Sequence, residues 1–288
     1  MKILMLGSGS VKSNFMYRLL ALGKALHRRG HEVSIIAPKA DKYNNFTPEN
    51  INAIDGVRVL QPFQFATKRL EINLLPYLFG AARLVLREKP DLVYVYKPTP
   101  ISVVGFIAKL RGIPVVLDMD DLGSEVMRVE GHPLYMRKLV ERCEKFALRR
   151  ADALVMASTL LSDTYAKAFP KKPVLWLPNG VESGWFGKVL PRKRKYQIVF
   201  FGALNRKNIV EPLFDVLPKI IDQYPAVHVL LIGDGKHMSY FKAKAEEMGI
   251  GKHITFTGWL QLDSAHALLR AGDIGYNYMP DELTVRAA

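Results

Sequence analysis

Residues 184–202, GWFGKVLPRKRKYQIVFFG, divide the chain into two parts that repeat one pattern. Up to Lys195 this stretch contains glycine, proline and the basic run Arg192–Lys195, with little periodic apolar content, which is typical of a linker. A strand pattern then begins with Ile198–Phe201 and stops at Gly202. We therefore predict a domain boundary between residues 187 and 188.

Strand-like apolar runs alternate with helical patterns on both sides of this boundary. Before it, strands are expected at 2–6, 32–37, 57–60, 91–96, 115–118, 153–157 and 174–177, with helices at about 14–29, 74–88, 100–111, 134–150 and from 159. After it, strands are expected at 198–201, 227–232, 254–257 and 273–276, with helices at about 210–223, 238–248 and 264–270. The alternation predicts an α/β fold of two tandem Rossmann-like domains, residues 1–187 and 188–288. We expect the second domain to be incomplete, because no helix follows its fourth strand.

Composition limits the class of protein. Of the 288 residues, 49% are hydrophobic and 24% are charged, which excludes a disordered or low-complexity chain. The single cysteine, Cys143, excludes an intrachain disulfide and a cysteine-based zinc site, and favours a reducing compartment such as the cytoplasm. No stretch approaches the roughly 20 uninterrupted apolar residues that span a bilayer. The seven histidines show no metal-ligand spacing, so no metal is expected.

The charge balance points to anionic partners. There are 41 lysines and arginines against 27 acidic residues, a net charge of +14. No nucleic-acid recognition motif accompanies this excess, so nucleic acid is not expected. The helix expected at 134–150 has an apolar face (Leu139, Val140, Cys143, Phe146 and Ala147) within a basic remainder. Together with an apolar run at 74–79, it suggests a peripheral site on an anionic membrane, although an ordinary salt-bridged surface has the same pattern.

A small-residue loop follows the first strand. Gly7, Ser8, Gly9 and Ser10 precede the first helix, so main-chain N–H groups there can approach a phosphate at the positive helix end. The dinucleotide fingerprint fails, because Lys12 occupies its third glycine position, and NAD is therefore not expected. A ligand-facing loop and a plain tight turn both remain open.

An acidic cluster, Asp118-Met119-Asp120-Asp121, ends another apolar strand. Open α/β sheets place ligands at the carboxyl ends of their strands. Three carboxylates in four residues repel one another unless a cation or a proton relieves them. They suit a metal-binding D-x-D, the acid pair of an aspartate-dependent phosphatase, a carboxylate that orients an acceptor hydroxyl, or a loop network without chemistry.

In the second domain, a basic pair follows the first strand. Arg206 and Lys207 come after Gly202 and just before a helix, so two cations and a helix N-terminus can bind a diphosphate there. Gly233-Asp234-Gly235 forms a second turn at the carboxyl end of the next strand. A solvated basic loop and an ordinary turn are the alternatives.

Several short motifs recur in a fixed order along the chain. They are GHEV at 30–33, KPDLV at 89–93, ADALVMAS at 151–158, LPNGVE at 177–182, FG at 201–202 with Arg206 and Lys207, LIGDG at 231–235, FTG at 256–258 and AGDI at 271–274. Together they resemble the family-4 glycosyltransferases of the GT-B fold. The resemblance implies two domains that face each other across a cleft, with a nucleotide-sugar donor held mainly by the second.

The resemblance also implies roles for particular residues. Arg206 and Lys207 would steady the departing diphosphate, and the loops at Gly7–Ser10, Gly202, Gly233–Gly235 and Gly258 would contact the donor. The family's histidine-containing dipeptide is here Asp120-Asp121, which leaves these two carboxylates as the candidates on the acceptor side. Glu282 approaches the first acid of the family's E-x(7)-E motif, and the second acid lies beyond Ala288, so we expect a chain truncated at its carboxyl end.

We therefore expect a glycosyltransferase that moves a sugar from a nucleotide-sugar to a glycan or lipid-linked acceptor in cell-envelope biosynthesis. The resemblance implies retention at the anomeric carbon, no metal and no cofactor beyond the donor, which is a co-substrate. A sugar-nucleotide epimerase of the same fold is an alternative. A non-catalytic binding subunit that a partner chain completes is another.

Overall fold

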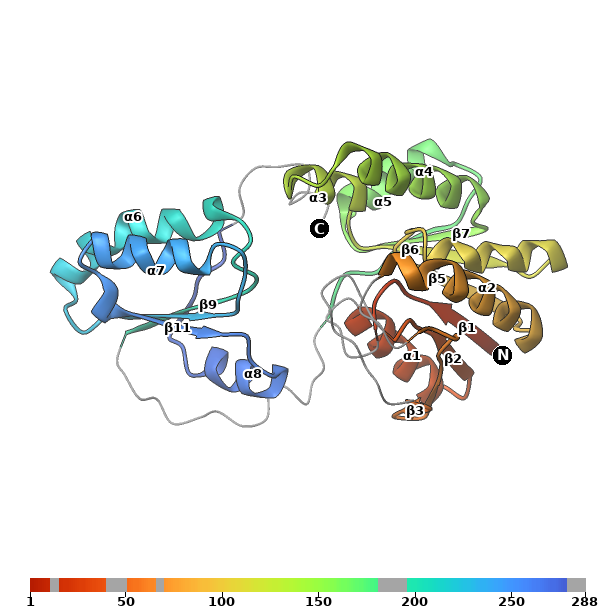
Figure 1. Cartoon of the computed structure of the whole chain (residues 1–288), viewed down its shortest axis with the longest axis horizontal. Coiled ribbons are helices and arrows are strands. Elements are labelled where there is room, and N and C mark those ends of the chain that lie inside the picture. Colours follow the sequence, from red (N-terminus) through yellow and green to blue (C-terminus); the bar gives the residue numbers. More distant parts are fainter. Residues whose placement is uncertain (11–15, 40–50, 66–69, 181–195, 279–288) are drawn as a thin grey trace. The chain divides into compact units, whose positions relative to one another are not determined.

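A computed structural model describes residues 1–10, 16–39, 51–65, 70–180 and 196–278. They form two compact units, one ending at Gly180 and the other within residues 196–278 (Figure 1). Each unit contains its own sheet. The boundary predicted between residues 187 and 188 lies outside the described residues.

The first unit is built on an eight-stranded sheet. Its strands are β1 (Lys2–Leu6), β2 (Glu32–Ile36), β3 (Ala53–Ile54), β4 (Val57–Leu60), β5 (Leu92–Tyr96), β6 (Val115–Met119), β7 (Ala153–Met156) and β8 (Val174–Trp176). Their spatial order is β3-β4-β2-β1-β5-β6-β7-β8, and every pair is parallel except β3 with β4. The order reverses between β1 and β5, which makes that point of the carboxyl edge the favoured place for a ligand.

Helices cover both faces of this sheet. They are α1 (Tyr17–Arg28), α2 (Leu70–Glu88), the 3₁₀ helix η2 (Ser102–Arg111), α3 (Gly123–Val129), α4 (Leu134–Arg150) and α5 (Thr159–Ala168). One core joins α2, η2, α4 and α5 to alternate side chains of β1, β5, β6 and β7. The other core joins α1 to the intervening side chains of the same strands, which include Tyr94 and Tyr96. Successive strand residues point to opposite faces, so the sheet presents two separate sets of side chains.

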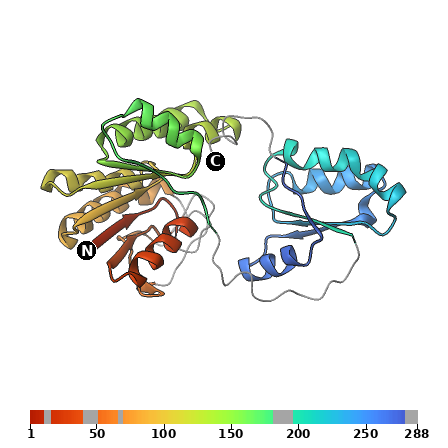
Figure 2. The same ribbon diagram turned by 180° about the vertical axis from the view of Figure 1, so that it is seen from behind.

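The second unit repeats the plan with four parallel strands. These are β9 (Gln197–Phe201), β10 (His228–Ile232), β11 (Ile254–Gly258) and β12 (Ile274–Gly275), in the order β11-β10-β9-β12. Helices α6 (Lys207–Gln223) and α7 (Met238–Glu247) lie on one face, and α8 (Leu262–Arg270) lies on the other (Figures 1 and 2). A short 3₁₀ turn, η4 (Gly251–His253), leads into β11.

The structure corrects several expectations. Residues 102–111 form a 3₁₀ helix, and three of the described elements, β3, α3 and η4, were not predicted. On α4, Leu139 and Phe146 of the predicted apolar face are 47% and 44% exposed, whereas Ala147 of that face is buried, as is Glu144. In the run at 74–79, Leu75 and Phe79 are exposed but Tyr77 is fully buried. Among the helices of the described segments, none has both the length and the hydropathy to cross a bilayer.

Candidate functional site

The acidic cluster of the first unit lies on the face of the sheet that α1 covers. Tyr96 of β5 stands beside Asp118 of β6 in the parallel register, and both strands send alternate polar side chains to this face. The Tyr94 hydroxyl donates to Asp118 Oδ2 at 2.8 Å, and the Tyr96 hydroxyl donates to Asp120 Oδ2 at 2.6 Å. Two tyrosines of one strand therefore hold one aspartate within the next strand and another just beyond its end.

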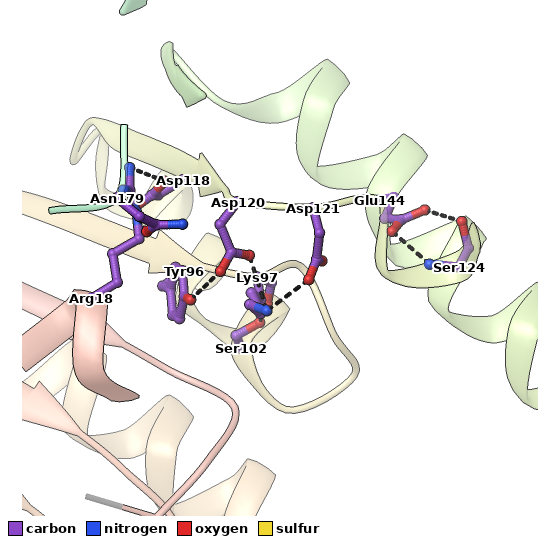
Figure 3. Close-up of polar contacts among 10 residues, drawn as sticks. All are labelled: Arg18, Tyr96, Lys97, Ser102, Asp118, Asp120, Asp121, Ser124, Glu144 and Asn179. Carbon is purple, nitrogen blue, oxygen red and sulfur yellow. Dashed lines mark hydrogen bonds and ion pairs between the residues drawn. The ribbon is translucent and has the colours of Figure 1, made fainter. Parts of the chain in front are cut away.

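Asp118 forms the most enclosed ion pair of this cluster. Arg18 of α1 contacts it with two nitrogens, Nε at 2.8 Å from Oδ2 and Nη2 at 3.1 Å from Oδ1. The same guanidinium donates to the Leu177 carbonyl at 2.7 Å. It also donates to Asn179 Oδ1 at 3.0 Å, and Figure 3 shows Arg18 beside Asn179. Burial raises the pKa of Asp118, and the hydrogen bonds from Arg18 and Tyr94 oppose that shift. Asp118 therefore ties β6 to α1 and to the last residues of the unit.

Asp120 and Asp121, the predicted acid pair, share one lysine. Lys97 Nζ lies 3.0 Å from Asp120 Oδ1 and 2.9 Å from Asp121 Oδ2 (Figure 3). Burial lowers the pKa of Lys97, but the charges of Asp121 and Asp120 outweigh it, and the pKa is raised above its ordinary value. The two cations Lys97 and Arg18 relieve the repulsion among the three carboxylates without a metal ion.

The structure thus distinguishes among the chemistries that the acidic motif allows. The oxygens of Asp118 and Asp120 are directed to tyrosine, arginine and lysine donors rather than to a common vacant point. No group of three potential metal ligands occurs in the described part of the chain. Arg18 and Lys97 offset two of the three carboxylate charges, so the cluster carries one net negative charge. A carboxylate that orients a hydroxyl group fits this arrangement better than a D-x-D metal site.

A second buried carboxylate fixes the segment that follows the acid pair. Glu144 of α4 accepts from the Ser124 backbone N–H at 3.0 Å and from the Ser124 hydroxyl at 2.5 Å (Figure 3). Ser124 lies in the first turn of α3, where N–H groups have no partner within the helix. Glu144 therefore anchors α3 only three residues after Asp121.

The loop Gly7–Ser10 lies at the carboxyl end of β1, beside the switch point of the sheet. A Cβ atom on Gly7 would lie 2.3 Å from Met16 Sδ, so Gly7 packs closely against the side chain that precedes α1. Ser8 is half-buried, whereas Gly9 and Ser10 are buried. Residues 11–15 lie outside the described residues, so phosphate binding by this loop stays a prediction.

Three predicted loops of the second unit are linked through their backbones. Gly202 N–H donates to the Ile232 carbonyl at 3.0 Å, Leu204 N–H to the Asp234 carbonyl at 2.9 Å, and Gly233 N–H to the Gly258 carbonyl at 3.2 Å. Gly233 has a φ of +138°, and a Cβ atom on it would lie 2.0 Å from the Gly202 carbonyl oxygen. The structure therefore brings Gly202, Gly233–Gly235 and Gly258 together at one edge of the sheet, and the tight contact requires glycine at 233.

The predicted basic pair begins α6 at the same edge. Arg206 is the residue before the helix, and Lys207 is its first residue. Lys207 Nζ lies 3.5 Å from the centroid of the Tyr240 ring of α7, a cation–π contact that the sequence did not predict. Burial, followed by the charges of Lys236 and Lys207, lowers the pKa of His237 at the start of α7. Lys207 thus lies near a further cation, Lys236, and near His237 where α7 begins. Glu282 lies outside the described residues.

Comparisons with known proteins assign each unit to a family. Residues 17–180 match the family described as "Glycosyl transferase 4-like domain", and residues 195–279 match "Glycosyl transferases group 1". The first match covers more than half of the chain. The two matches follow one another in the order of the two structural units.

Individual relatives are distant. YqgM of Bacillus subtilis, an uncharacterized glycosyltransferase, is 24% identical over 212 residues, which are 71% of this chain and 57% of that protein. The GDP-mannose-dependent α-(1-6)-phosphatidylinositol monomannoside mannosyltransferase of Mycolicibacterium smegmatis is 23% identical over 265 residues, which are 83% of this chain and 63% of that protein. The chain therefore spans less than two thirds of the length of these two relatives.

Solved structures show the same fold. Sucrose-phosphate synthase of Thermosynechococcus elongatus aligns with a TM-score of 0.69 at 17% identity, over 95% of this chain and 74% of that one. This likeness, together with the two sheets described above, confirms the predicted fold class of two Rossmann-like α/β units in tandem.

Proposed function

The chain belongs to the glycosyl transferase 4-like family, and we propose that it moves a sugar from a nucleotide-sugar donor to a glycan or lipid-linked acceptor. The observation that carries the proposal is the pair of glycosyltransferase family matches, one for each unit and in chain order. The donor is a co-substrate in this reaction, and no resident cofactor takes part. The lipid-linked acceptor is supported by the mycobacterial relative, whose name specifies a phosphatidylinositol mannoside.

On the donor side, the chemistry rests on Arg206 and Lys207. Breaking the bond between sugar and phosphate develops negative charge on the diphosphate oxygens. Two cations at the N-terminus of the 17-residue helix α6 stabilise that charge without a metal ion. The loops at Gly202 and Gly233–Gly235 pack closely together at the same edge of the sheet as this helix N-terminus. A metal-independent reaction with retention at the anomeric carbon is the form that we propose.

On the acceptor side, the chemistry rests on Asp120 and Asp121. A carboxylate that accepts a hydrogen bond from the acceptor hydroxyl orients its oxygen for attack on the anomeric carbon. The net negative charge of the cluster favours a hydrogen bond donated by the acceptor hydroxyl. These two residues therefore take the place of a histidine-containing dipeptide.

The surface of α4 supports a membrane-bound acceptor. Tyr135 and Leu139 are 73% and 47% exposed, and the cations Lys138 and Arg142 lie exposed between and beyond them. Apolar side chains interleaved with cations favour the surface of an anionic bilayer. We propose a peripheral enzyme of cell-envelope biosynthesis at the cytoplasmic face of the membrane.

The decisive experiment measures sugar transfer by the complete natural chain. UDP- and GDP-sugars are offered in turn with lipid-extract acceptors, and radiolabelled product is separated from donor. Arg206→Ala combined with Lys207→Ala should lower kcat by about 100-fold or more, because loss of one charge-stabilising donor already costs roughly that factor. Lys219→Ala, an exposed lysine near the far end of the same helix, is the matched control and should keep wild-type turnover.

The outcomes separate the alternatives. Unchanged turnover in the double variant would overturn the diphosphate role of Arg206 and Lys207. A changed nucleotide-sugar formed without acceptor would identify an epimerase instead. Binding of nucleotide without any product, across all donors and acceptors, would favour a binding subunit over an enzyme.

A further inference from the structure

Lys97 has an unusual backbone conformation at the carboxyl end of β5. Its φ is +54°, in the left-handed region that non-glycine residues rarely occupy. Several hydrogen bonds hold it there. Its N–H donates to the Asp118 carbonyl at 3.0 Å, and its carbonyl accepts from Thr99 N–H at 2.8 Å and from the Ser102 hydroxyl. Such strain persists only where the surroundings enforce it, and it is frequent at functional sites.

This conformation delivers the side chain of Lys97 into the acid pair. The Lys97 side chain is 16% exposed, and its ammonium group lies within 3.0 Å of both Asp120 and Asp121. The Tyr96 hydroxyl holds the other oxygen of Asp120 at 2.6 Å. Asp121 is the more accessible carboxylate of the pair, with 25% of its side chain exposed against 14% for Asp120.

Charge explains why this lysine matters for orientation. Two adjacent carboxylates without a cation between them would repel each other and turn apart towards solvent. The shared ammonium group instead attracts both, so that Lys97 fixes the position of one oxygen of each carboxylate. Arg18 cannot substitute, because both of its charged contacts go to Asp118.

On the basis of the proposed function, we propose that Lys97 is a positioning residue that aims Asp121 at the acceptor hydroxyl while Tyr96 and Lys97 together immobilise Asp120. The lysine itself contacts neither donor nor sugar. Its role differs from that of the donor-binding cations of the second unit, and nothing in the family matches assigns it.

The test compares Lys97→Met with Lys97→Arg in the complete chain. Both replacement side chains are unbranched, so the energetic cost of the positive φ at residue 97 is about the same in the two variants. A difference between the variants therefore reports the charge. Lys97→Met should lower kcat about 100-fold, because a catalytic group that is misplaced by roughly 1 Å loses about that factor. The KM for the donor should stay unchanged. Lys97→Arg should recover most of that loss because it retains the charge. Lys109→Met removes a surface lysine that pairs with Asp152 at 2.6 Å, and it should behave as wild type.

Hydrogen exchange supplies a readout that does not depend on activity. In Lys97→Met, the amides of residues 119–124 should exchange faster, while those of β1 and β10 keep their protection. Equal kcat in Lys97→Met and wild type, or equal loss in the methionine and arginine variants, would overturn the proposal. If the wild type transfers no sugar at all, the proposed function fails, and unchanged exchange at 119–124 would then reject the positioning role as well.

Discussion

Two buried carboxylates of the first unit differ in how well their charge is compensated. Asp118, with no exposed surface, receives hydrogen bonds from both Arg18 and Tyr94. Within the described segments, Glu144, 6% exposed, accepts from Ser124 alone, through its N–H and its hydroxyl. Burial, aided by the nearby charges of Asp121 and Glu141, raises the pKa of Glu144 although Ser124 opposes the shift. Glu144 is therefore a charged group whose negative charge is poorly compensated.

This difference predicts the effect of replacing Glu144 with glutamine. The amide can accept from the Ser124 N–H and donate to its hydroxyl, so both hydrogen bonds survive without the charge. A raised native pKa means that the native state holds its proton more tightly than the unfolded state, so stability falls as pH rises through that pKa. Glu144→Gln should therefore unfold with a larger free energy than wild type at pH 8. The difference should close as the pH approaches 4.5, the ordinary value.

Urea denaturation followed by circular dichroism from pH 4.5 to 8 measures this effect. Glu144→Ala is the contrasting variant, and it should lose about 1–3 kcal/mol at every pH because it leaves a Ser124 N–H without its acceptor. Asp163→Asn, which removes an exposed acid of α5, controls for a general change of charge. A glutamine variant less stable than wild type at pH 8 would show that Glu144 contributes through its charge.

At the residue scale, the sequence predicts which side chains lie together only where they are neighbours in the chain. Asp120 and Asp121 are neighbours, and Gly233 and Gly235 flank one aspartate, so their clustering is visible in the chain. The partners of these residues were missed because they come from distant segments. Arg18 lies 100 residues from Asp118. A lone lysine after an apolar strand, such as Lys97, gives no local signal that it will meet two carboxylates.

At the scale of elements, α4 exposes part of the apolar face that the sequence predicts. The structure buries Ala147 of this face together with Leu148, and it leaves Leu139 and Phe146 half exposed. The Phe146 ring packs edge to face against Phe106 of η2, with ring centroids 5.4 Å apart. The helix therefore keeps a row of large apolar side chains at its surface.

That surface leads to a prediction about lipid binding. Vesicles containing phosphatidylglycerol should carry the protein upward in a flotation gradient at low salt, whereas pure phosphatidylcholine vesicles should not. Tyr135→Glu combined with Leu139→Glu should weaken this binding about ten-fold or more, because it removes buried apolar area and adds repulsion. Val216→Glu changes a comparably exposed apolar residue of α6 and should float as wild type does. If the double variant of α4 floats as well as Val216→Glu does, a role for α4 in membrane binding is refuted.

The described elements that the sequence did not predict are short or lack buried apolar residues. Helix α3 buries none of its residues, so it has no apolar period to reveal it. Strand β3 has only two residues and pairs antiparallel with β4 through a turn at Asp55 and Gly56, both with positive φ. An Asp-Gly pair between short strands is the usual signal of such a hairpin. Buried strands of five residues were, by contrast, predicted to within about one residue at most ends.

At the scale of the whole molecule, repetition made the fold predictable. Each unit alternates buried strands with helices, and right-handed crossovers then determine the strand order around β1 and β9. In both units the first strand lies inside the sheet, and polar loops gather at the carboxyl edge. One unit collects carboxylates there, whereas the other collects glycines and cations, and this contrast could be predicted from the motifs alone.

The contrast predicts where a nucleotide contacts the full chain. Saturating UDP or GDP should slow amide exchange at residues 202–208 and 233–237, by about 100-fold at a ligand concentration of 100 Kd, because bound phosphates block opening of these loops. Residues 118–124 of the first unit should exchange unchanged, since their net charge repels a diphosphate. Uridine, which lacks phosphates, should leave residues 204–208 unprotected from exchange. UDP should also leave them unprotected in the variant that combines Arg206→Ala with Lys207→Ala. Protection confined to the acidic cluster would contradict the assignment, because it would place the diphosphate among carboxylates rather than at the helix N-terminus with its two cations.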